Sequence, residues 1–258
     1  MQEYDDQTID AVVTSPPYNL GIDYGSTVTD SGTREEYLTE FTPAWLTEVK
    51  RLLKPDGHFF LNLGAAPSNP LLPYQVLMLA VGMGWKLQNT IHWVKSITFE
   101  DKKGDKVTRG HFKPINSPRY LNDAHEFIFH LTHDGCRPVC RKADGVGVPY
   151  SDPSNITRWD HTDGENLRCG GNNWLIPYET INSSTLQRPH PATFPVELVE
   201  RCLKLAGEPK VVLDPFVGIG TTMVAAEKCG AEWVIGIDLC AEYAVEAVHR
   251  LNTKVHYA

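Results

Sequence analysis

No segment of the sequence approaches the roughly 18 uninterrupted apolar residues that a membrane-spanning helix needs. Residues 1–6 carry three acidic side chains and no basic one, so they lack the charge pattern with which a secretory signal peptide begins. The six cysteines show no close, regular spacing, which argues against a disulfide framework and for reduced thiols. These absences predict a cytoplasmic protein that is not inserted in a membrane.

Positive charge is also scarce. The chain has 24 Lys and Arg against 32 Asp and Glu, a formal net charge of -8, which argues at first against a nucleic-acid partner. The charges are unevenly placed, however. Residues 86–142 hold 11 basic and 6 acidic side chains, a net +5, which leaves 13 basic and 26 acidic side chains, a net -13, elsewhere. A basic segment on an acidic body is typical of a local nucleic-acid contact, although a solvated loop explains the charge alone about as well.

Regular secondary structure is predicted at both ends of the chain. Short apolar or β-branched runs bounded by turn residues predict strands at residues 9–14, 58–63, 85–94, 125–131, 210–214 and 233–238. Helical spacing of apolar residues predicts helices at residues 33–53, where a capping box begins, 71–83, 195–206, 221–229 and 240–251. Strands that alternate with helices predict an α/β fold, with a mostly parallel sheet covered by helices on both faces.

Two stretches in the middle of the chain lack this regularity. Residues 96–122 and 134–187 are rich in polar residues, Gly and Pro, and show little periodicity. Irregular chain of this length within a compact protein usually belongs to a functional insertion. The sequence therefore predicts two halves of one α/β domain, separated by an inserted region that contains a core strand near 125–131.

A turn between strand and helix near the carboxyl end of the chain is predicted to bind a cofactor. Residues 211–222 read Val-Val-Leu-Asp-Pro-Phe-Val-Gly-Ile-Gly-Thr-Thr. Gly218 and Gly220 allow a ligand to approach the backbone closely, and Thr221 or Thr222 is placed to cap the helix that follows. Tight turns of this kind also occur without a ligand, so the glycine pattern alone is a weak signal.

Asp238 strengthens the cofactor interpretation. It ends the next predicted strand, 20 residues after Gly218, where a carboxylate accepts hydrogen bonds from the hydroxyls of a ribose. A dinucleotide-binding dehydrogenase is the competing enzyme class, but Met223 stands where its third glycine is needed, and no phosphate-binding Lys follows the turn. A nucleoside cofactor without a pyrophosphate, such as S-adenosylmethionine, needs neither feature, and the sequence favours it.

A second turn, after the first predicted strand, is suited to chemistry on an amine. Ser15, Pro16, Pro17 and Tyr18 follow the strand at 9–14, at the carboxyl end where open α/β sheets place their sites. The two prolines stiffen the backbone and leave carbonyl groups without internal partners. Ser15 Oγ and the Pro16 carbonyl are placed to accept the two N–H hydrogens of a planar amine, while Tyr18 stacks on its ring. A merely stiff turn is the alternative.

The two turns together carry a family resemblance. Thr14-Ser-Pro-Pro-Tyr18, followed much later by Asp214-Pro-Phe-x-Gly-x-Gly-Thr-Thr222, resembles the motifs of the β-class exocyclic-amino DNA methyltransferases. In that family the catalytic motif precedes the cofactor motif, and the target-recognition region lies between them. Three further segments resemble family motifs in the same order, at residues 52–57, 91–95 and 190–195.

The resemblance, which covers residues 9–95 and 189–251, has consequences for the fold. It implies a Rossmann-like, S-adenosylmethionine-dependent methyltransferase fold with a circularly permuted motif order. It also implies three regions: the catalytic half in residues 1–95, the target-recognition region in 96–187 and the cofactor-binding half in 188–258.

The resemblance also implies the residues of the site. The catalytic motif consists of Ser15, Pro16, Pro17 and Tyr18. The residues expected around S-adenosylmethionine come from both turns and from the segment before the second turn: Thr14, Pro191, Phe194, Asp214, Pro215, Phe216, Gly218, Gly220, Thr221, Thr222 and Asp238. No metal ion is expected, because the spacing of His133, Cys136 and Cys140 matches no familiar zinc pattern.

The expected activity is site-specific transfer of a methyl group from S-adenosylmethionine to an exocyclic amine of double-stranded DNA, with the target base flipped out of the helix. Within the family, Ser-Pro-Pro-Tyr generally marks cytosine-N4 enzymes and Asp-Pro-Pro-Tyr adenine-N6 enzymes, so N4 of cytosine is favoured and N6 of adenine is the alternative. A catalytically inactive DNA-binding subunit and an RNA methyltransferase stay open as further alternatives. A cognate restriction endonuclease and a second copy of the chain, in a homodimer, are possible partners.

One family feature is missing. Relatives often carry a strand with Gly-Asp ahead of the catalytic strand, which helps to hold the adenine of the cofactor, but only eight residues precede Ile9 and they contain no Gly-Asp. Either residues 253–257 supply that strand, or the chain starts inside a longer open reading frame.

Overall fold

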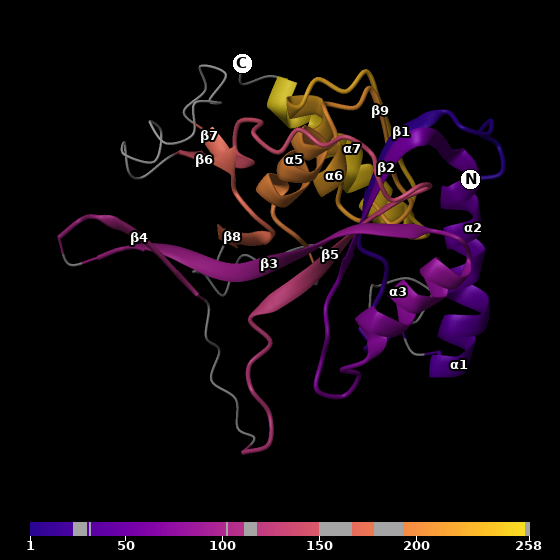
Figure 1. Ribbon diagram of the computed structural model, residues 1–258, viewed down its shortest axis with the longest axis horizontal. Helices are drawn as coiled ribbons and strands as arrows, with labels where there is room; N and C mark the ends of the chain where they lie inside the picture. The colour runs from indigo at the N-terminus through magenta and orange to yellow at the C-terminus, as the bar shows by residue number, and fades with distance from the viewer. Residues whose placement is uncertain are drawn as a thin grey trace.

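A computed structural model of the chain describes residues 1–22, 30, 32–101, 103–110, 118–149, 167–177 and 193–255. Within these residues, eight strands form one sheet and helices cover both of its faces (Figure 1). The predicted α/β, Rossmann-like architecture is therefore confirmed.

The parallel half of the sheet is built around β1 (Ile9–Thr14), the run of β-branched residues that the sequence indicates. β1 lies between β2 (Leu53–Leu63) and β9 (Val211–Asp214), and β10 (Trp233–Gly236) pairs with the outer side of β9. All of these pairs are parallel. The carboxyl ends of the four strands consequently meet at one edge of the sheet, where both predicted functional turns begin.

The other half of the sheet is mixed. β5 (His125–Thr132) pairs antiparallel with β2 and with β3 (Lys86–Glu100), and β3 turns back antiparallel into β4 (Lys106–Gly110). β8 (Asn173–Pro177) adds a parallel strand beside β3. The order across the sheet is β10-β9-β1-β2-β5-β3-β4. The distal part of β3 and β4 forms an arm that extends away from the helices (Figure 1).

The inserted region contributes more to the sheet than the sequence indicates. β4 and β8 join the sheet in addition to the predicted strand β5, and β6 (Gly147–Pro149) pairs with β7 (Leu167–Cys169) in a separate two-stranded sheet. β3 continues past the predicted end at Val94 to Glu100, so residue 95 lies within a strand. β2 begins at Leu53 rather than at residue 58, because Leu53 pairs with Ile9 across a register shift.

Helices from the first half of the chain cover one face. The capping box predicted at Thr33 is present and starts α1 (Arg34–Glu36), which passes through a π-helical turn, η1 (Tyr37–Phe41), into α2 (Thr42–Leu52). α3 (Leu72–Gly82) contacts α2. Apolar side chains from these helices pack against β1, β2 and β5 in a core that includes Leu46, Phe59, Val76, Trp85 and Phe129.

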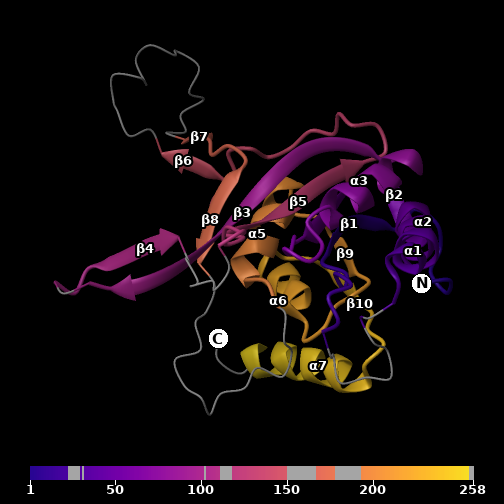
Figure 2. The same ribbon diagram turned by 90° about the horizontal axis from the view of Figure 1, so that it is seen from below.

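Helices from the last third of the chain cover the opposite face. α5 (Val196–Leu205) and α6 (Thr221–Lys228) pack on it in a core that includes Val13, Phe60, Trp93, Leu198 and Ala225. α7 (Ala241–Val255) contacts α6, and Figure 2 shows the three helices grouped together, apart from α1, α2 and α3. Within the described part of the chain, no helix combines the length and apolar character needed to cross a membrane.

The C-terminal helix overturns one sequence interpretation. Because α7 continues to Val255, residues 253–255 are helical, and the hypothesis that residues 253–257 supply an additional strand is wrong for them. Residues 256 and 257 lie outside the described residues.

Two histidines are buried side by side between β2 and β5. His58 Nδ1 and His130 Nε2 are 2.9 Å apart, and Asn89 Nδ2 lies 2.9 Å from His130 Nδ1. Burial lowers the pKa of both imidazoles, that of His130 to about 3, and the neighbouring His58 adds to the effect on His130. Both side chains are therefore neutral at pH 7, when one ring can donate its hydrogen to the other.

The two buried histidines are expected to make the unfolding free energy fall as the pH is lowered from about 7.5 to about 5, whereas buried Asp214, whose pKa is raised, acts in the opposite direction. An unfolded histidine takes up a proton near pH 6.5, whereas folded His130 resists protonation until the pH is far lower, so acid favours the unfolded state. Urea unfolding at a series of pH values measures this slope. His130→Gln removes one histidine contribution, so the unfolding free energy of this variant should fall less on acidification than that of the wild type, and identical slopes for the two proteins would contradict the buried neutral pair.

Candidate active site

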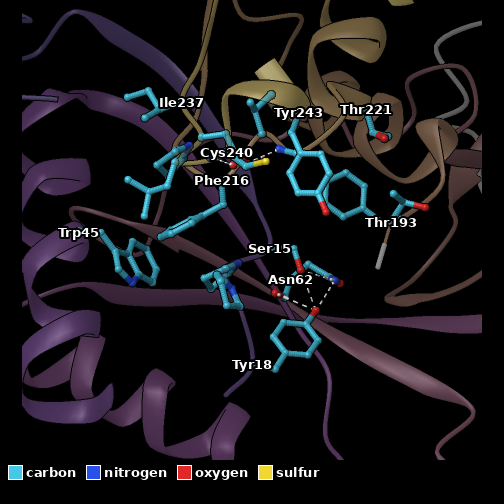
Figure 3. A pocket seen from close by; sticks show the side chains of 18 of the residues that line it. Ser15, Tyr18, Trp45, Asn62, Thr193, Phe216, Thr221, Ile237, Cys240 and Tyr243 are labelled. Carbon is cyan, nitrogen blue, oxygen red and sulfur yellow. Dashed lines mark hydrogen bonds between the residues drawn. The ribbon is translucent and has the colours of Figure 1, made fainter. Parts of the chain in front are cut away.

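A cavity of about 820 Å³ opens at the edge of the sheet where β1, β2, β9 and β10 end. This volume lies within the roughly 300–1,000 Å³ typical of small-ligand sites. Ser15 and Tyr18 enter it from the turn after β1, and Phe216 enters it from the turn after β9 (Figure 3). The two turns that the sequence singles out therefore line one cavity.

Asp214, the last residue of β9, lies beneath the cavity and is 1% exposed. Its carboxylate accepts hydrogen bonds from Thr14 Oγ1 at 2.6 Å, from Thr222 Oγ1 at 2.5 Å and from the backbone N–H of Phe216 at 3.0 Å. Burial raises the pKa of Asp214 to about 6, and these three hydrogen bonds oppose the rise. The carboxylate thus connects the end of β1 to the turn after β9 and to the start of α6.

Glycine allows the turn after β9 to lie close against α7. Gly220 has a φ of 81°, in the left-handed region, and a Cβ at this position would be 2.7 Å from the Cβ of Ala247. Gly218 has a φ of 50° and donates its backbone N–H to Asp238 Oδ2 at 2.9 Å. Glycine is therefore favoured at both positions by the left-handed backbone conformation, and at Gly220 also by the close approach of α7.

The start of α6 differs from the sequence interpretation. Gly220 is the N-cap residue, and no side chain caps the helix, so the prediction that Thr221 or Thr222 caps it is wrong. Thr222 donates its hydroxyl to Asp214 instead. Thr221 lines the cavity, and its hydroxyl lies 3.5 Å from a guanidinium nitrogen of Arg250.

Asp238 follows β10 and lines the cavity. Its two carboxylate oxygens accept the backbone N–H groups of Gly218 and Cys240, each at 2.9 Å. An ionised carboxylate has about four acceptor sites, so these two backbone donors orient the group and leave capacity for hydroxyls of a ligand.

Aromatic side chains form part of the cavity wall. The ring of Phe216 packs edge-on against Trp45, with centroids 5.5 Å apart, and lies 5.8 Å from the ring of Phe41. The motif after β9 identifies Phe216. Trp45 and Phe41 come from α2 and η1, where their spacing reads as ordinary core, so sequence reasoning missed them.

The catalytic motif belongs to a polar cluster. Ser15 Oγ lies 2.8 Å from Tyr18 Oη, which donates to Glu126 Oε2 at 3.1 Å. Asn62 Nδ2 donates to Glu126 Oε2 at 2.6 Å and to Tyr18 Oη at 2.9 Å, as Figure 3 shows for the contact with Tyr18. Lys95 Nζ forms an ion pair with Glu126 Oε1 at 2.8 Å. The cluster therefore combines residues of the turn after β1 with side chains from β2, β3 and β5.

Asn62 presents an unused acceptor at this cluster. The residue is 2% exposed and lines the cavity, and its Oδ1 is buried without a hydrogen-bond partner among the described residues. A buried polar atom without a partner is costly unless a ligand satisfies it. Sequence reasoning missed Asn62 and Glu126, although each is a polar residue close to the end of a predicted strand.

Most of the predicted site residues line the cavity, namely Ser15, Pro16, Pro17, Tyr18, Phe194, Pro215, Phe216, Gly218, Thr221 and Asp238. Four others do not line it, namely Thr14, Asp214, Gly220 and Thr222. Pro191 lies outside the described residues. In the described ranges, no three His, Cys, Asp or Glu side chains gather in a way that would hold a metal ion.

Comparisons with known proteins agree with this geometry. A family model described as DNA methylase, for N6 and N4 enzymes, matches residues 9–249. The chain is 29% identical to the Type II methyltransferase M.HpaI of Haemophilus parainfluenzae, over 98% of this chain and 71% of that protein. It is 28% identical to the Type II methyltransferase M.ScaI of Streptomyces caespitosus, over 96% of this chain and 76% of that protein.

Solved structures resemble this fold. The PvuII DNA methyltransferase, described as cytosine-N4-specific, matches with a TM-score of 0.66 at 19% identity, over 96% of this chain and 81% of that chain. A putative DNA modification methylase from Thermus thermophilus, complexed with S-adenosyl-L-methionine, matches with a TM-score of 0.59 at 24% identity, over 96% of this chain and 87% of that chain. At these identities the likeness shows the fold alone. The family match, however, runs from β1 into α7 across both turns, and the chain belongs to the family of N6- and N4-specific DNA methylases, which use S-adenosylmethionine.

Proposed function

We propose that the protein transfers a methyl group from S-adenosylmethionine to the exocyclic N4 amine of a cytosine that is flipped out of double-stranded DNA. The observation that carries the proposal is that Ser15 and Asn62 line the same cavity as Asp238, and that Asn62 Oδ1 has no hydrogen-bond partner among the described residues. Acceptors of this kind are suited to an amine, and a carboxylate at Asp238 is suited to a ribose. The Ser-Pro-Pro-Tyr form of the catalytic motif supports cytosine over adenine through the family resemblance.

The Asp238 side of the cavity is suited to the cofactor. Asp238 accepts hydrogen bonds from the ribose hydroxyls, because its two backbone partners leave acceptor capacity. Phe216, Trp45 and Phe41 offer an aromatic wall on which an adenine ring packs. S-adenosylmethionine supplies a methyl group that its sulfonium makes electrophilic.

The Ser15 side of the cavity activates the amine. The lone pair of cytosine N4 is delocalised into the ring, so the nitrogen is a weak nucleophile. When Ser15 Oγ, the Pro16 carbonyl or Asn62 Oδ1 accept its N–H hydrogens, the nitrogen is drawn toward tetrahedral geometry and its lone pair becomes available for in-line attack. The same oxygen dipoles stabilise the positive charge that develops on nitrogen as the N–C bond forms and the S–C bond of the sulfonium breaks, and the methylated nitrogen then loses a proton to water. The cavity walls hold the amine in position.

The substrate proposal extends to the DNA around the base. A base inside a duplex does not reach Ser15, so it has to be flipped out at a cost of about a few kcal/mol. Exposed Lys103, Lys106 and Arg109 on the β3–β4 arm, in the region 96–187 that we assign to target recognition, are suited to phosphate contacts. We also extend the proposal to a cognate restriction endonuclease, because the curated relatives are named Type II methyltransferases, and to a homodimer on the family resemblance.

Nucleoside analysis of methylated DNA tests the reaction. DNA incubated with the protein and S-adenosylmethionine, digested and resolved by chromatography and mass spectrometry, should contain N4-methyldeoxycytidine. Ser15→Ala removes one acceptor and should slow single-turnover methyl transfer by roughly 10²-fold, with cofactor binding unchanged. N6-methyldeoxyadenosine would make adenine the target. Cofactor binding without any modified nucleoside would favour an inactive DNA-binding subunit, and a wild-type rate for Ser15→Ala would exclude the acceptor role.

Calorimetric titration with S-adenosylmethionine tests the role of Asp238. Asp238→Ala removes a charged acceptor and should weaken cofactor affinity by roughly 10-fold to 100-fold. Glu232→Ala, which removes a largely exposed carboxylate next to the other end of β10, is the matched control and should leave affinity unchanged. Equal affinity of the wild type and Asp238→Ala would show that the ribose is held elsewhere.

A further inference from the structure

The carboxylate of Glu126 lies at the centre of the polar cluster around the catalytic motif. Its Oε2 accepts from Tyr18 and Asn62, and its Oε1 accepts from Lys95. The side chain of Glu126 is 13% exposed and that of Lys95 is 29% exposed. The ammonium of Lys95 therefore neutralises a carboxylate that is largely removed from water.

An ionised carboxylate only accepts hydrogen bonds, and this determines the direction of the contacts at Ser15. Tyr18 has one hydroxyl hydrogen to donate, and its Oη lies closer to Glu126 Oε2, at 3.1 Å, than to the backbone carbonyl oxygen of Asn62, at 3.4 Å. With that hydrogen directed to Glu126, the 2.8 Å contact between Ser15 Oγ and Tyr18 Oη requires Ser15 to donate. Ser15 Oγ then has only lone pairs left for the cavity.

The same carboxylate determines the orientation of the Asn62 amide. Only the NH₂ end of an amide can donate to Glu126, so Nδ2 faces Glu126 and Tyr18, at 2.6 Å and 2.9 Å. Oδ1 is left on the other side of the amide, buried and without a partner among the described residues. The contacts of Glu126 therefore leave both Ser15 Oγ and Asn62 Oδ1 as hydrogen-bond acceptors.

We propose that Glu126, held by Lys95, is a positioning residue that directs the hydrogen bonds of this cluster so that Ser15 Oγ and Asn62 Oδ1 both accept from the target amine. The proposal rests on the proposed methylation of an exocyclic amine. Such an amine has two N–H donors, each of which needs an acceptor. A protein donor that faced one of these N–H groups would repel it. Burial and the charge of Glu126 raise the pKa of Tyr18 well above its usual value, so its hydroxyl stays a donor at neutral pH.

Glu126→Gln keeps the size of the side chain and should reverse the direction of the hydrogen bonds in the cluster. Lys95 holds the amide oxygen of the new side chain, so its NH₂ group turns toward Tyr18 and Asn62. Tyr18 then directs its hydrogen to Ser15, and the Asn62 amide flips to accept, so that both groups offer donors to the amine. Single-turnover methyl transfer should slow by roughly 10²-fold, with kcat reduced and the KM for S-adenosylmethionine unchanged.

A second substitution separates this role from a structural one. In the double variant Asn62→Asp/Glu126→Gln, the new carboxylate at position 62 accepts from the new amide at position 126 and from Tyr18, and still presents an oxygen to the amine. Its rate should recover to within about tenfold of the wild type, a coupling that independent sites do not show. Asn62→Asp alone places two carboxylates side by side and should be slow.

Four proteins are compared with the wild type: Glu126→Gln, Asn62→Asp, the double variant, and Glu197→Gln, the same change at a solvent-exposed position of α5 that should not alter the rate. Calorimetric binding of S-adenosylmethionine verifies that each is folded. A double variant as slow as Glu126→Gln, or a wild-type rate for Glu126→Gln, would overturn the positioning role. Absence of product with the wild type would overturn the proposed function as well, and the two failures are therefore distinguishable.

Discussion

The geometry of the site depends on the buried carboxylate of Asp214, which accepts hydrogen bonds from the end of β1, from the turn after β9 and from the first turn of α6. Burying an ionised group without partners is very unfavourable, and three donors offset that cost only in part, as the raised pKa of Asp214 records. Because Thr14 and Asp214 are 200 residues apart in sequence, their contact sets the Ser-Pro-Pro-Tyr motif beside the turn after β9.

On either side of Asp214, the ends of the parallel strands line two different sides of the cavity. The segments that follow β9 and β10 carry Phe216 and Asp238, on the side suited to a nucleoside cofactor. β1 and β2 end near Ser15 and Asn62, on the side suited to an amine. The antiparallel strand β5 then brings Glu126 into contact with Tyr18 and Asn62 from the other half of the sheet. Three exposed cations of the basic segment 86–142, Lys103, Lys106 and Arg109, lie on the β3–β4 arm, whereas acidic side chains outnumber basic ones outside that segment.

The sequence predicts those features that depend on local pattern. β-branched runs predict β1 and β9, the capping box at Thr33 is present, and both turns are identified by residues that constrain the backbone, such as Gly220. Local sequence pattern does not predict those strand boundaries that depend on pairing with a distant strand. β2 begins at Leu53 because Ile9 pairs with it, although the residues between Leu53 and His58 have turn-like composition.

The polar cluster could not be predicted for the same reason. Asn62 meets Glu126 only because β2 and β5 pair antiparallel, and Lys95 joins them only because β3 lies on the other side of β5. The register between distant strands is a tertiary property, set by packing on both faces of the sheet. Thr222 could not be placed for a different reason. Its position near the start of α6 suggests a helix cap, but its hydroxyl donates to the buried carboxylate of Asp214 instead.

The central claim, that Asp214 couples the catalytic strand to the cofactor turn, is tested most directly by calorimetric titration of Thr14→Val with S-adenosylmethionine. Thr14 does not line the cavity, and valine keeps its shape while removing the 2.6 Å hydrogen bond to Asp214. If the coupling holds, cofactor affinity falls by roughly tenfold, the equivalent of one lost buried hydrogen bond. Wild-type affinity in a folded Thr14→Val protein would contradict it.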